Sequence, residues 1–401
     1  MMNPTLPRRS AITLASLRDE GFRPFFLFGA LHAGLMIALW IPWFLGFLHV
    51  PTAFTPIVWH QHELLFGYVP AIIAGFLLTA MPNWTKRKVI SGTPLVLLVL
   101  LWLAGRFAVI ASESIGMPLA SAIAFAFLPV LTLLALHELT ASRNRRNYKI
   151  AAVLGVFVGA QALFLYEFHR FGRVEIADRL AIATIILLIG IVGGRVIPVF
   201  TGNWLRSNNP GREPSPFGRL DLAAMLVSVL ALAAWPAAVL SDGLAGPAGA
   251  LMIAAGIFQL LRQARWCPHR TFREPLVTIL HVAFLFVPIG FLLTGTALLT
   301  EDTGFRSAGV HAWTAGAIGA MTLAIMTRAT RGHSGQPLHA PLSTVLFIYA
   351  PIVLAAYMRI ATALLPEYTM SLLPLAALFW VLAFLGYVFL YGPMVLRRRA
   401  H

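Results

Sequence analysis

Residues 59–68 read WHQHELLFGY and stand directly before the apolar run Val69–Met81. The stretch places two imidazoles and a carboxylate, those of His60, His62 and Glu63, at the mouth of a segment long enough to enter a membrane. Ionisable side chains at the edge of a membrane span are costly to bury, so a partner or a function is expected for them. The stretch therefore raises two questions: how the chain crosses the membrane, and what the histidines bind.

The composition of the chain indicates how it crosses the membrane. The chain of 401 residues is 59% hydrophobic and 11% charged, with a mean hydropathy of +0.80, whereas soluble domains carry roughly 25% charged residues. This composition predicts an all-α polytopic membrane protein with no separate soluble domain. The net charge of +15 does not indicate nucleic-acid binding, because the Arg and Lys residues lie in short loops on one side of the expected spans.

A membrane-spanning helix needs about 20 apolar residues, and twelve segments qualify. We predict spans over 25–47, 60–81, 94–112, 118–138, 149–169, 178–201, 219–240, 245–263, 275–299, 307–328, 343–365 and 371–396. Alternate loops are basic, and the loops between them carry mainly acidic residues, which predicts that both termini are cytoplasmic. The domain organisation expected is a cytoplasmic segment 1–24, one membrane domain 25–396 and a cytoplasmic tail 397–401.

The ends of three spans resemble one another. The second span ends in FLLTAMPNW (76–84), the sixth in VIPVFTGNW (196–204) and the tenth in AIMTRAT (324–330). Spacings of roughly 120 residues are consistent with three four-helix repeats, in which His32 corresponds to His281 and His62 to His311. The alternative is chance similarity among apolar helices.

The predicted orientation sorts the candidate histidines into two layers. His60, His62 and His311 fall near the periplasmic face, while His32 and His281 fall about 10 Å from the cytoplasmic edge. A lone histidine at a helix end is more often an interfacial or hydrogen-bonded residue. That is the expectation for the remaining histidines, namely His49, His137, His169, His269, His333, His339 and His401.

The chemistry of each layer depends on local conformation. In a helix the side chains of His60 and His62 point about 200° apart and would serve two centres, whereas in an extended segment they share a face and could bind one copper ion with His311. Glu63 is then placed to accept the second ring N–H of a histidine ligand. In the other layer, His32 and His281 would suit haem with two imidazole ligands. His32 with the thioether of Met36 would equally suit copper.

Cysteine and arginine limit the cofactors further. Cys267 is the only cysteine, which excludes disulfides and thiolate metal sites. Arg106, Arg195 and Arg359 lie within apolar runs and could bind a buried anion such as a haem propionate, and Arg106 and Arg195 are the candidates we select. The alternatives are snorkelling at helix ends and pairing with acidic residues.

Several motifs together resemble the NnrS family. They are GFRPFFL (21–27), WHQHE (59–63), AGFLLTAMPNW (74–84), GGRVIP (193–198) with TGN (201–203), and HAW (311–313) leading to MTR (326–328). The resemblance spans nearly the whole chain. It implies a multi-pass protein of the bacterial inner membrane that carries haem and copper and belongs to nitric oxide metabolism.

These observations predict a function. We expect one or two haem b groups and copper, with nitric oxide bound and reduced or detoxified on the periplasmic side. The partners expected are membrane lipid, nitric oxide and an unidentified electron donor, with no nucleic acid. The alternatives are a haem-binding sensor or assembly partner without turnover, and a secondary transporter of the major facilitator type. The transporter reading is weakened by the loop Lys86–Lys88, which lacks a preceding Gly-x-x-x-Asp motif.

Overall fold

The computed structural model describes residues 13–397, so the ends of the predicted terminal segments, 1–12 and 398–401, lie outside the described residues. The elements of the described part are helices, and twelve are long and apolar enough to cross a membrane. The all-α fold and the number of spans are therefore confirmed.

The first six spans include one helix broken into successive pieces. In order they are α1 (Phe22–Phe44), then α2 (Pro56–His62) continued by η2 (Glu63–Tyr68) and α3 (Val69–Thr85), then α4 (Thr93–Ile110), α6 (Met117–Ala141), α7 (Tyr148–Phe171) with the preceding turn η3 (Arg145–Asn147), and α8 (Ile176–Asn208). The short helices η1 (Leu14–Arg18) and α5 (Ser112–Ile115) flank them.

The last six spans include two helices that are broken into successive pieces. They are α9 (Arg219–Ala237), α10 (Ala245–Ala264) between the turns η4 (Asp242–Leu244) and η5 (Pro268–Arg270), α11 (Pro275–Thr300), α12 (Thr303–His311) continued by η6 (Ala312–Gly319) and α13 (Ala320–His333), α14 (Leu342–Thr344) continued by η7 (Val345–Tyr349) and α15 (Ala350–Leu364), and η8 (Pro366–Tyr368) with α16 (Thr369–Leu396).

Helix boundaries follow local chemistry more closely than hydropathy. The second span is predicted over 60–81 but runs from Pro56 to Thr85. Proline is favoured in the first turn of a helix, where its missing N–H would have no partner, so Pro56 sets the start. The span ends at Thr85, because the next residue, Lys86, has a left-handed φ of 59° and cannot continue the helix.

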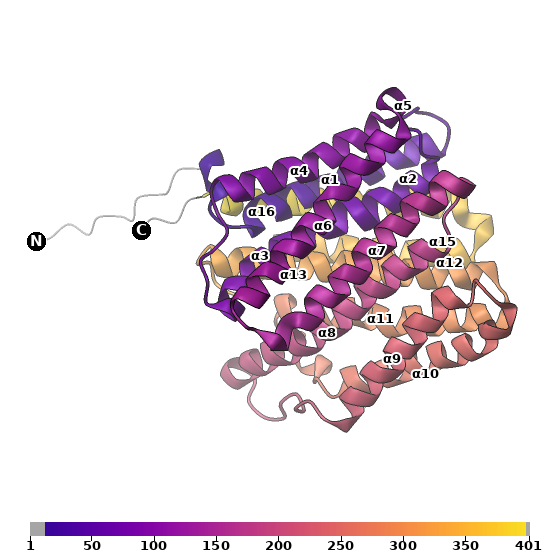
Figure 1. Ribbon diagram of the computed structural model, residues 1–401. Coiled ribbons are helices and arrows are strands. Elements are labelled where there is room, and N and C mark those ends of the chain that lie inside the picture. Colours follow the sequence, from indigo (N-terminus) through magenta and orange to yellow (C-terminus); the bar gives the residue numbers. More distant parts are fainter. Residues whose placement is uncertain (1–12, 398–401) are drawn as a thin grey trace, which may run out of the picture.

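The two ends of the described chain lie together at one face of the bundle. The Arg23 guanidinium donates to the carbonyl oxygens of Val395 and Arg397 at 2.5 and 2.8 Å, and the Thr13 N–H donates to Leu396 O at 2.9 Å. An even number of crossings puts both ends on the same side, so this contact agrees with twelve spans. In Figure 1 the helices run side by side, with α1 beside α16 and with α9 and α10 at one edge of the bundle.

Three spans are interrupted by π-helical segments. The first, η2, begins directly after His62, the second, η6, begins directly after His311, and the third is η7 in the eleventh span. A π-helical turn carries an extra residue and occurs frequently at functional sites. The two histidines that the predicted repeat aligns therefore hold the same position relative to a π segment, while the repeat itself stays a prediction.

The orientation of the bundle can be tested with fusions. Because the basic loops predict cytoplasmic termini, a fluorescent protein joined to residue 401 should fold and fluoresce, and alkaline phosphatase joined there should be inactive. Phosphatase inserted after Asp242, in an acidic loop, should be active. Active phosphatase at the C-terminus and fluorescence from the Asp242 position would reverse the orientation.

Candidate functional site

A central cavity of about 490 Å³ lies among the first, second, sixth, tenth, eleventh and twelfth spans. Ligand sites in proteins range over about 300–1,000 Å³ and combine apolar walls with a few placed polar groups. Here the walls are mostly aliphatic and aromatic. The polar groups among the lining residues are His60, Gln61, Tyr68, Asp178, Thr303, Ser307, His311, Thr314, Arg359, Thr362 and Thr369.

His311 is held in one tautomer by its own helix. Its Nδ1 lies 2.7 Å from the carbonyl oxygen of Ser307, one turn earlier, so Nδ1 carries the proton and donates it. Nε2 is then unprotonated, and its lone pair has no hydrogen-bond partner among the described residues. An imidazole whose other nitrogen donates to a backbone carbonyl is the arrangement that metal-ligating histidines use.

His60 enters the same cavity from the second span. Its ring stacks on the indole of Trp40, with ring centroids 4.3 Å apart and planes inclined by 23°. The stacking fixes the ring plane without using either ring nitrogen. His60 and His311 are close enough to interact electrostatically, so the second and tenth spans present two imidazoles to one space.

Arg359 adds a positive charge to this space. It belongs to α15, lines the cavity with the two histidines, and forms no ion pair with a carboxylate among residues 13–397. A charge in an apolar setting is stabilised by an opposite charge. An anionic ligand would provide that charge.

Asp178 and Gln61 form the acidic part of the cavity wall. The side-chain amide of Gln61 donates to Asp178 Oδ2 at 3.2 Å, and the N–H of Arg179 donates to Oδ1 at 2.6 Å. The carboxyl group is thereby fixed at the start of α8, within the cavity lining.

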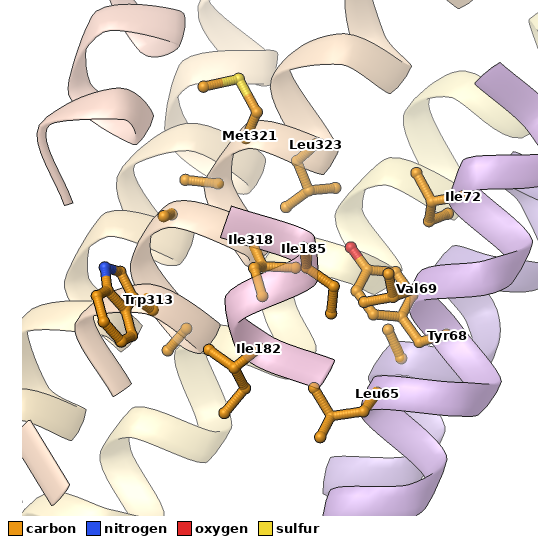
Figure 2. Close-up of a cluster of buried hydrophobic side chains, with 14 of the residues drawn as sticks. Leu65, Tyr68, Val69, Ile72, Ile182, Ile185, Trp313, Ile318, Met321 and Leu323 are labelled. Atoms are coloured by element: carbon orange, nitrogen blue, oxygen red, sulfur yellow. The ribbon is translucent and has the colours of Figure 1, made fainter. Parts of the chain in front are cut away.

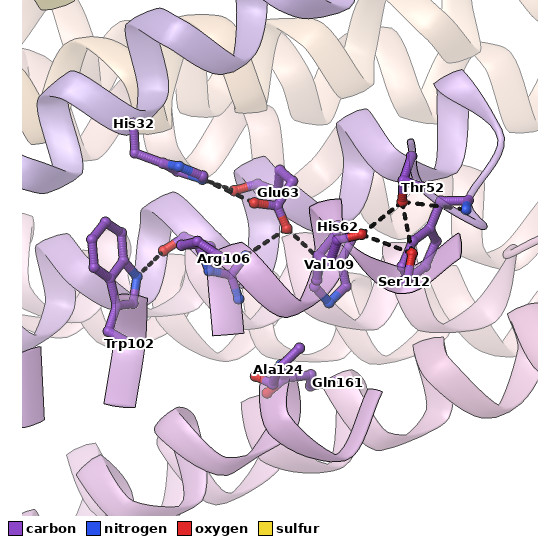
Figure 3. Close-up of polar contacts among 12 residues, drawn as sticks. His32, Thr52, His62, Glu63, Trp102, Arg106, Val109, Ser112, Ala124 and Gln161 are labelled. Carbon is purple, nitrogen blue, oxygen red and sulfur yellow. Dashed lines mark hydrogen bonds and ion pairs between the residues drawn. The ribbon is translucent and has the colours of Figure 1, made fainter. Parts of the chain in front are cut away.

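The opposite face of the second span carries a buried polar cluster centred on Glu63. Glu63 Oε1 accepts from Arg106 Nη1 at 2.6 Å and from His62 Nδ1 at 2.9 Å. Glu63 Oε2 lies 3.2 Å from His32 Nε2. The Glu63 side chain is fully buried, and its partners come from α1, α2 and α4 (Figure 3). The cluster ties three spans together.

Gly67 is required by the close packing around this cluster. A Cβ atom at this position would stand 2.5 Å from Arg106 Nη1 and 2.8 Å from His32 Nε2, closer than nonbonded atoms approach. The Gly67 carbonyl oxygen also accepts from Trp102 Nε1 at 2.8 Å. The Phe66-Gly67 pair of the opening motif is thus explained by space around the ion pair.

Residues 60–62 are helical in the structure, which is one of the two conformations considered from the sequence. His60 faces the cavity, whereas His62 is fully buried on the other side, against the rings of Phe54, Phe66 and Phe164. The predicted set of His60, His62 and His311 is therefore not gathered into one group. Within residues 13–397, no cluster of three or more His, Cys, Asp or Glu side chains could hold a metal ion.

The predicted cytoplasmic layer is divided as well. His32 contacts Glu63, which belongs to the other predicted layer, and packs edge-on against Trp102. His281 is buried on α11, where its Nε2 pairs with Thr201 Oγ1 at 2.9 Å and its carbonyl oxygen accepts from Gln263 at 2.6 Å. The two histidines share no partner, and each belongs to a separate polar cluster.

The arginine candidates also differ from one another. Arg106 is neutralised by Glu63, and Arg195 is exposed on α8 beside Arg146 and Lys149. Arg359, which was not selected from the sequence, is the arginine that lines the cavity. Hydropathy marks all three as intramembrane residues but does not say which way their helices face.

The residues that contact His311 and His60 were not identified from the sequence. Ser307 precedes His311 by four residues, which is a helical spacing, and so its contact was open to prediction. Trp40 carried no such signal, because its contact with His60 joins two separate spans.

Comparison with protein families shows which family the chain resembles in sequence. The family model described as NnrS protein matches residues 16–399. The chain belongs to the NnrS family. The match covers nearly the whole chain, and NnrS membership supports a nitric-oxide-related membrane protein of the multi-pass type. A search of curated proteins found no match.

The buried ion pair gives a stability prediction for this NnrS protein. Glu63→Leu should lower the free energy of unfolding by about 3–5 kcal/mol, because it leaves the Arg106 guanidinium uncompensated. The double variant Glu63→Leu/Arg106→Leu should recover much of that loss, since both charges are gone. Unfolding of the purified protein in detergent, followed by circular dichroism, measures both effects.

A matched control is available at the bundle surface. Arg87 and Glu138 are also 2.6 Å apart, but the Arg87 side chain is 43% exposed, so Arg87→Leu should cost less than about 1 kcal/mol. Equal losses for Glu63→Leu and Arg87→Leu would contradict the role given to the Glu63 cluster.

Proposed function

We propose that this NnrS protein binds haem b in the central cavity and uses it to bind and reduce, or otherwise detoxify, nitric oxide in a bacterial inner membrane. The observation that carries the proposal is the meeting of His60, His311 and Arg359 at one apolar cavity. Family membership supports the link to nitric oxide. The three residues come from the second, tenth and eleventh spans, so the site exists only in the folded bundle.

The residues fit the chemistry of haem. A haem is a large apolar disc with an iron that accepts imidazole nitrogen and with two anionic propionates. The cavity offers about 490 Å³, apolar walls, an imidazole whose Nε2 is left unprotonated, and an arginine without a carboxylate partner. Histidine ligands and arginine–propionate contacts are what such a group requires.

Each residue would have a defined part. His311 would hold the haem through Nε2, while the Ser307 carbonyl oxygen keeps the His311 ring oriented. His60 would offer a second imidazole to the haem, with its ring plane fixed by stacking on Trp40. Arg359 would bind the propionates. Haem, when bound, supplies an iron that binds nitric oxide and exchanges electrons. The apolar walls would exclude bulk water, and Asp178, fixed by Gln61, would hold a proton at Oδ2 for the reduction.

Copper fits the described residues less well. Copper sites draw their ligands from imidazole, thiolate or thioether groups. Within residues 13–397 no group of three His, Cys, Asp or Glu residues is assembled, and no part of the proposed chemistry is assigned to copper. Elemental analysis of the purified protein tests that choice, and stoichiometric copper would require an additional site.

The haem ligands are tested by single substitutions. His311→Ala and His60→Ala should lose most of the haem absorbance per protein, because each removes an imidazole from the cavity. His62→Ala, His32→Ala and His281→Ala should keep it, since these side chains are not among those that line the central cavity. Loss of haem only in the second group would move the haem site to the Glu63 or Thr201 clusters.

The role of Arg359 is tested by charge. Arg359→Leu should weaken haem retention on dilution in detergent, while Arg359→Lys should keep much of it, because the propionates need a cation. Arg195→Leu is the matched control, as this arginine is exposed on another span and should leave retention unchanged. Equal retention in all three variants would remove Arg359 from the site.

Turnover is tested with an electrode. The haem-loaded protein, kept free of oxygen and supplied with an excess of a chemical reductant as the electron source, should consume nitric oxide catalytically, and His311→Ala should not. A spectral change on adding nitric oxide without continued consumption would replace the reductase proposal with a sensor.

A further inference from the structure

A second cavity, of about 120 Å³, lies among α3, α7, α8 and α13. Its lining is aliphatic and aromatic apart from one hydroxyl, that of Thr322, and it contains no charged residue. Several lining residues are only half-buried, so the cavity reaches the outer surface of the bundle. Those residues are Ile73, Phe76, Leu188, Ile189, Val192, Val196 and Ile325.

The second cavity adjoins the central one. Val69 and Ile318 line both. Ile182 lines the central cavity, and Ile185, one turn further along α8, lines the second (Figure 2). The two spaces are therefore neighbours that share part of their lining.

One hydrogen bond crosses the boundary. The Tyr68 hydroxyl, on the side of the central cavity, pairs with Thr322 Oγ1, on the side of the second. Thr322 also donates to carbonyl oxygens of its own helix, at 2.7 Å to Ile318 and 2.9 Å to Gly319. The polar groups at the junction are thus bonded to one another, and the surface left for a passing molecule is apolar.

We infer that the second cavity is the passage by which an uncharged diatomic gas moves from the bilayer interior to the central cavity. This inference rests on the proposed function, which makes nitric oxide the ligand of the central site. Nitric oxide is small, carries no charge and dissolves in hydrocarbon, so it can enter through an apolar opening between helices. Ions and charged reductants cannot follow, because nothing in the lining would replace their hydration.

The volume and the apolar lining of the second cavity favour a small uncharged gas as its occupant. Apolar cavities of this kind stay dry and take up small apolar guests such as xenon. A volume of about 120 Å³ admits a diatomic gas but is about one quarter of the central cavity, so it cannot hold a haem. The passage also lies apart from Asp178, the acidic group of the central cavity, so the routes for gas and protons are separate.

The test compares two identical substitutions on one helix. Val192→Trp fills the second cavity, whereas Val199→Trp, two turns along α8, places the same ring at a position that is 56% exposed and outside the lining. With xenon as the probe, nuclear magnetic resonance of the protein in detergent should show bound xenon in the original protein and in Val199→Trp. Val192→Trp should show less bound xenon than Val199→Trp, because the second cavity is filled. This readout does not depend on haem, so it stands even if the proposed function fails.

A kinetic measurement then connects the cavity to the site. After flash photolysis of the carbon monoxide adduct, gas rebinding from the medium should be severalfold slower in Val192→Trp than in Val199→Trp, with an unchanged haem spectrum. Equal rebinding rates would overturn the inference while leaving the haem proposal intact. Xenon binding that appears only after lipid is stripped away would also overturn it, because an acyl chain would then be the occupant.

Discussion

The ion pair between Glu63 and Arg106 is the interaction on which the rest of the site depends. Moving a carboxylate and a guanidinium out of water costs several kcal/mol per ion, and the loss is recovered only when the geometry satisfies both groups. Glu63 recovers much of this cost through contacts with Arg106, His62 and His32, which join the second span to its neighbours. Within the described residues Glu63 Oε2 and Arg106 Nε are buried without a hydrogen-bond partner, so the pair is only partly satisfied. Once that face of the second span is fixed, the opposite face, with His60, is fixed toward the cavity. The Glu63 cluster, which lies outside the central cavity, therefore sets which face of the second span lines that cavity.

The fold was open to prediction because a bilayer reduces the problem to length and hydropathy. Each span had to supply about 20 apolar residues, and twelve did, so the number of spans follows from the sequence. The ends were less certain because they depend on local backbone chemistry. Pro56 begins the second span four residues earlier than hydropathy indicates, and the left-handed Lys86 ends it. The contact of Arg23 with Val395 was beyond prediction, because it joins distant parts of the chain.

The existence of a buried histidine site could be predicted from the sequence, but which side chains meet in it could not. Histidines inside an apolar sequence indicate a buried site, and His60 and His311 do meet at one cavity. Their partners could not be assigned because the direction of a side chain depends on helix rotation, which hydropathy leaves free when a helix is apolar all round. For this reason His62 was grouped with His60 although it contacts Glu63, and Arg106 and Arg195 were selected ahead of Arg359.

The π segment at residues 63–68 has a consequence for how this part of the chain can vary. Each residue of an α-helix turns the helix by about 100°, so one extra residue shifts the register of everything that follows. A deletion of one residue within η2 would restore regular α-helix there and rotate α2, with His60, relative to α3. Length here is therefore as constrained as composition. A change of one residue in the count between His60 and Val69 would turn the imidazole away from the cavity.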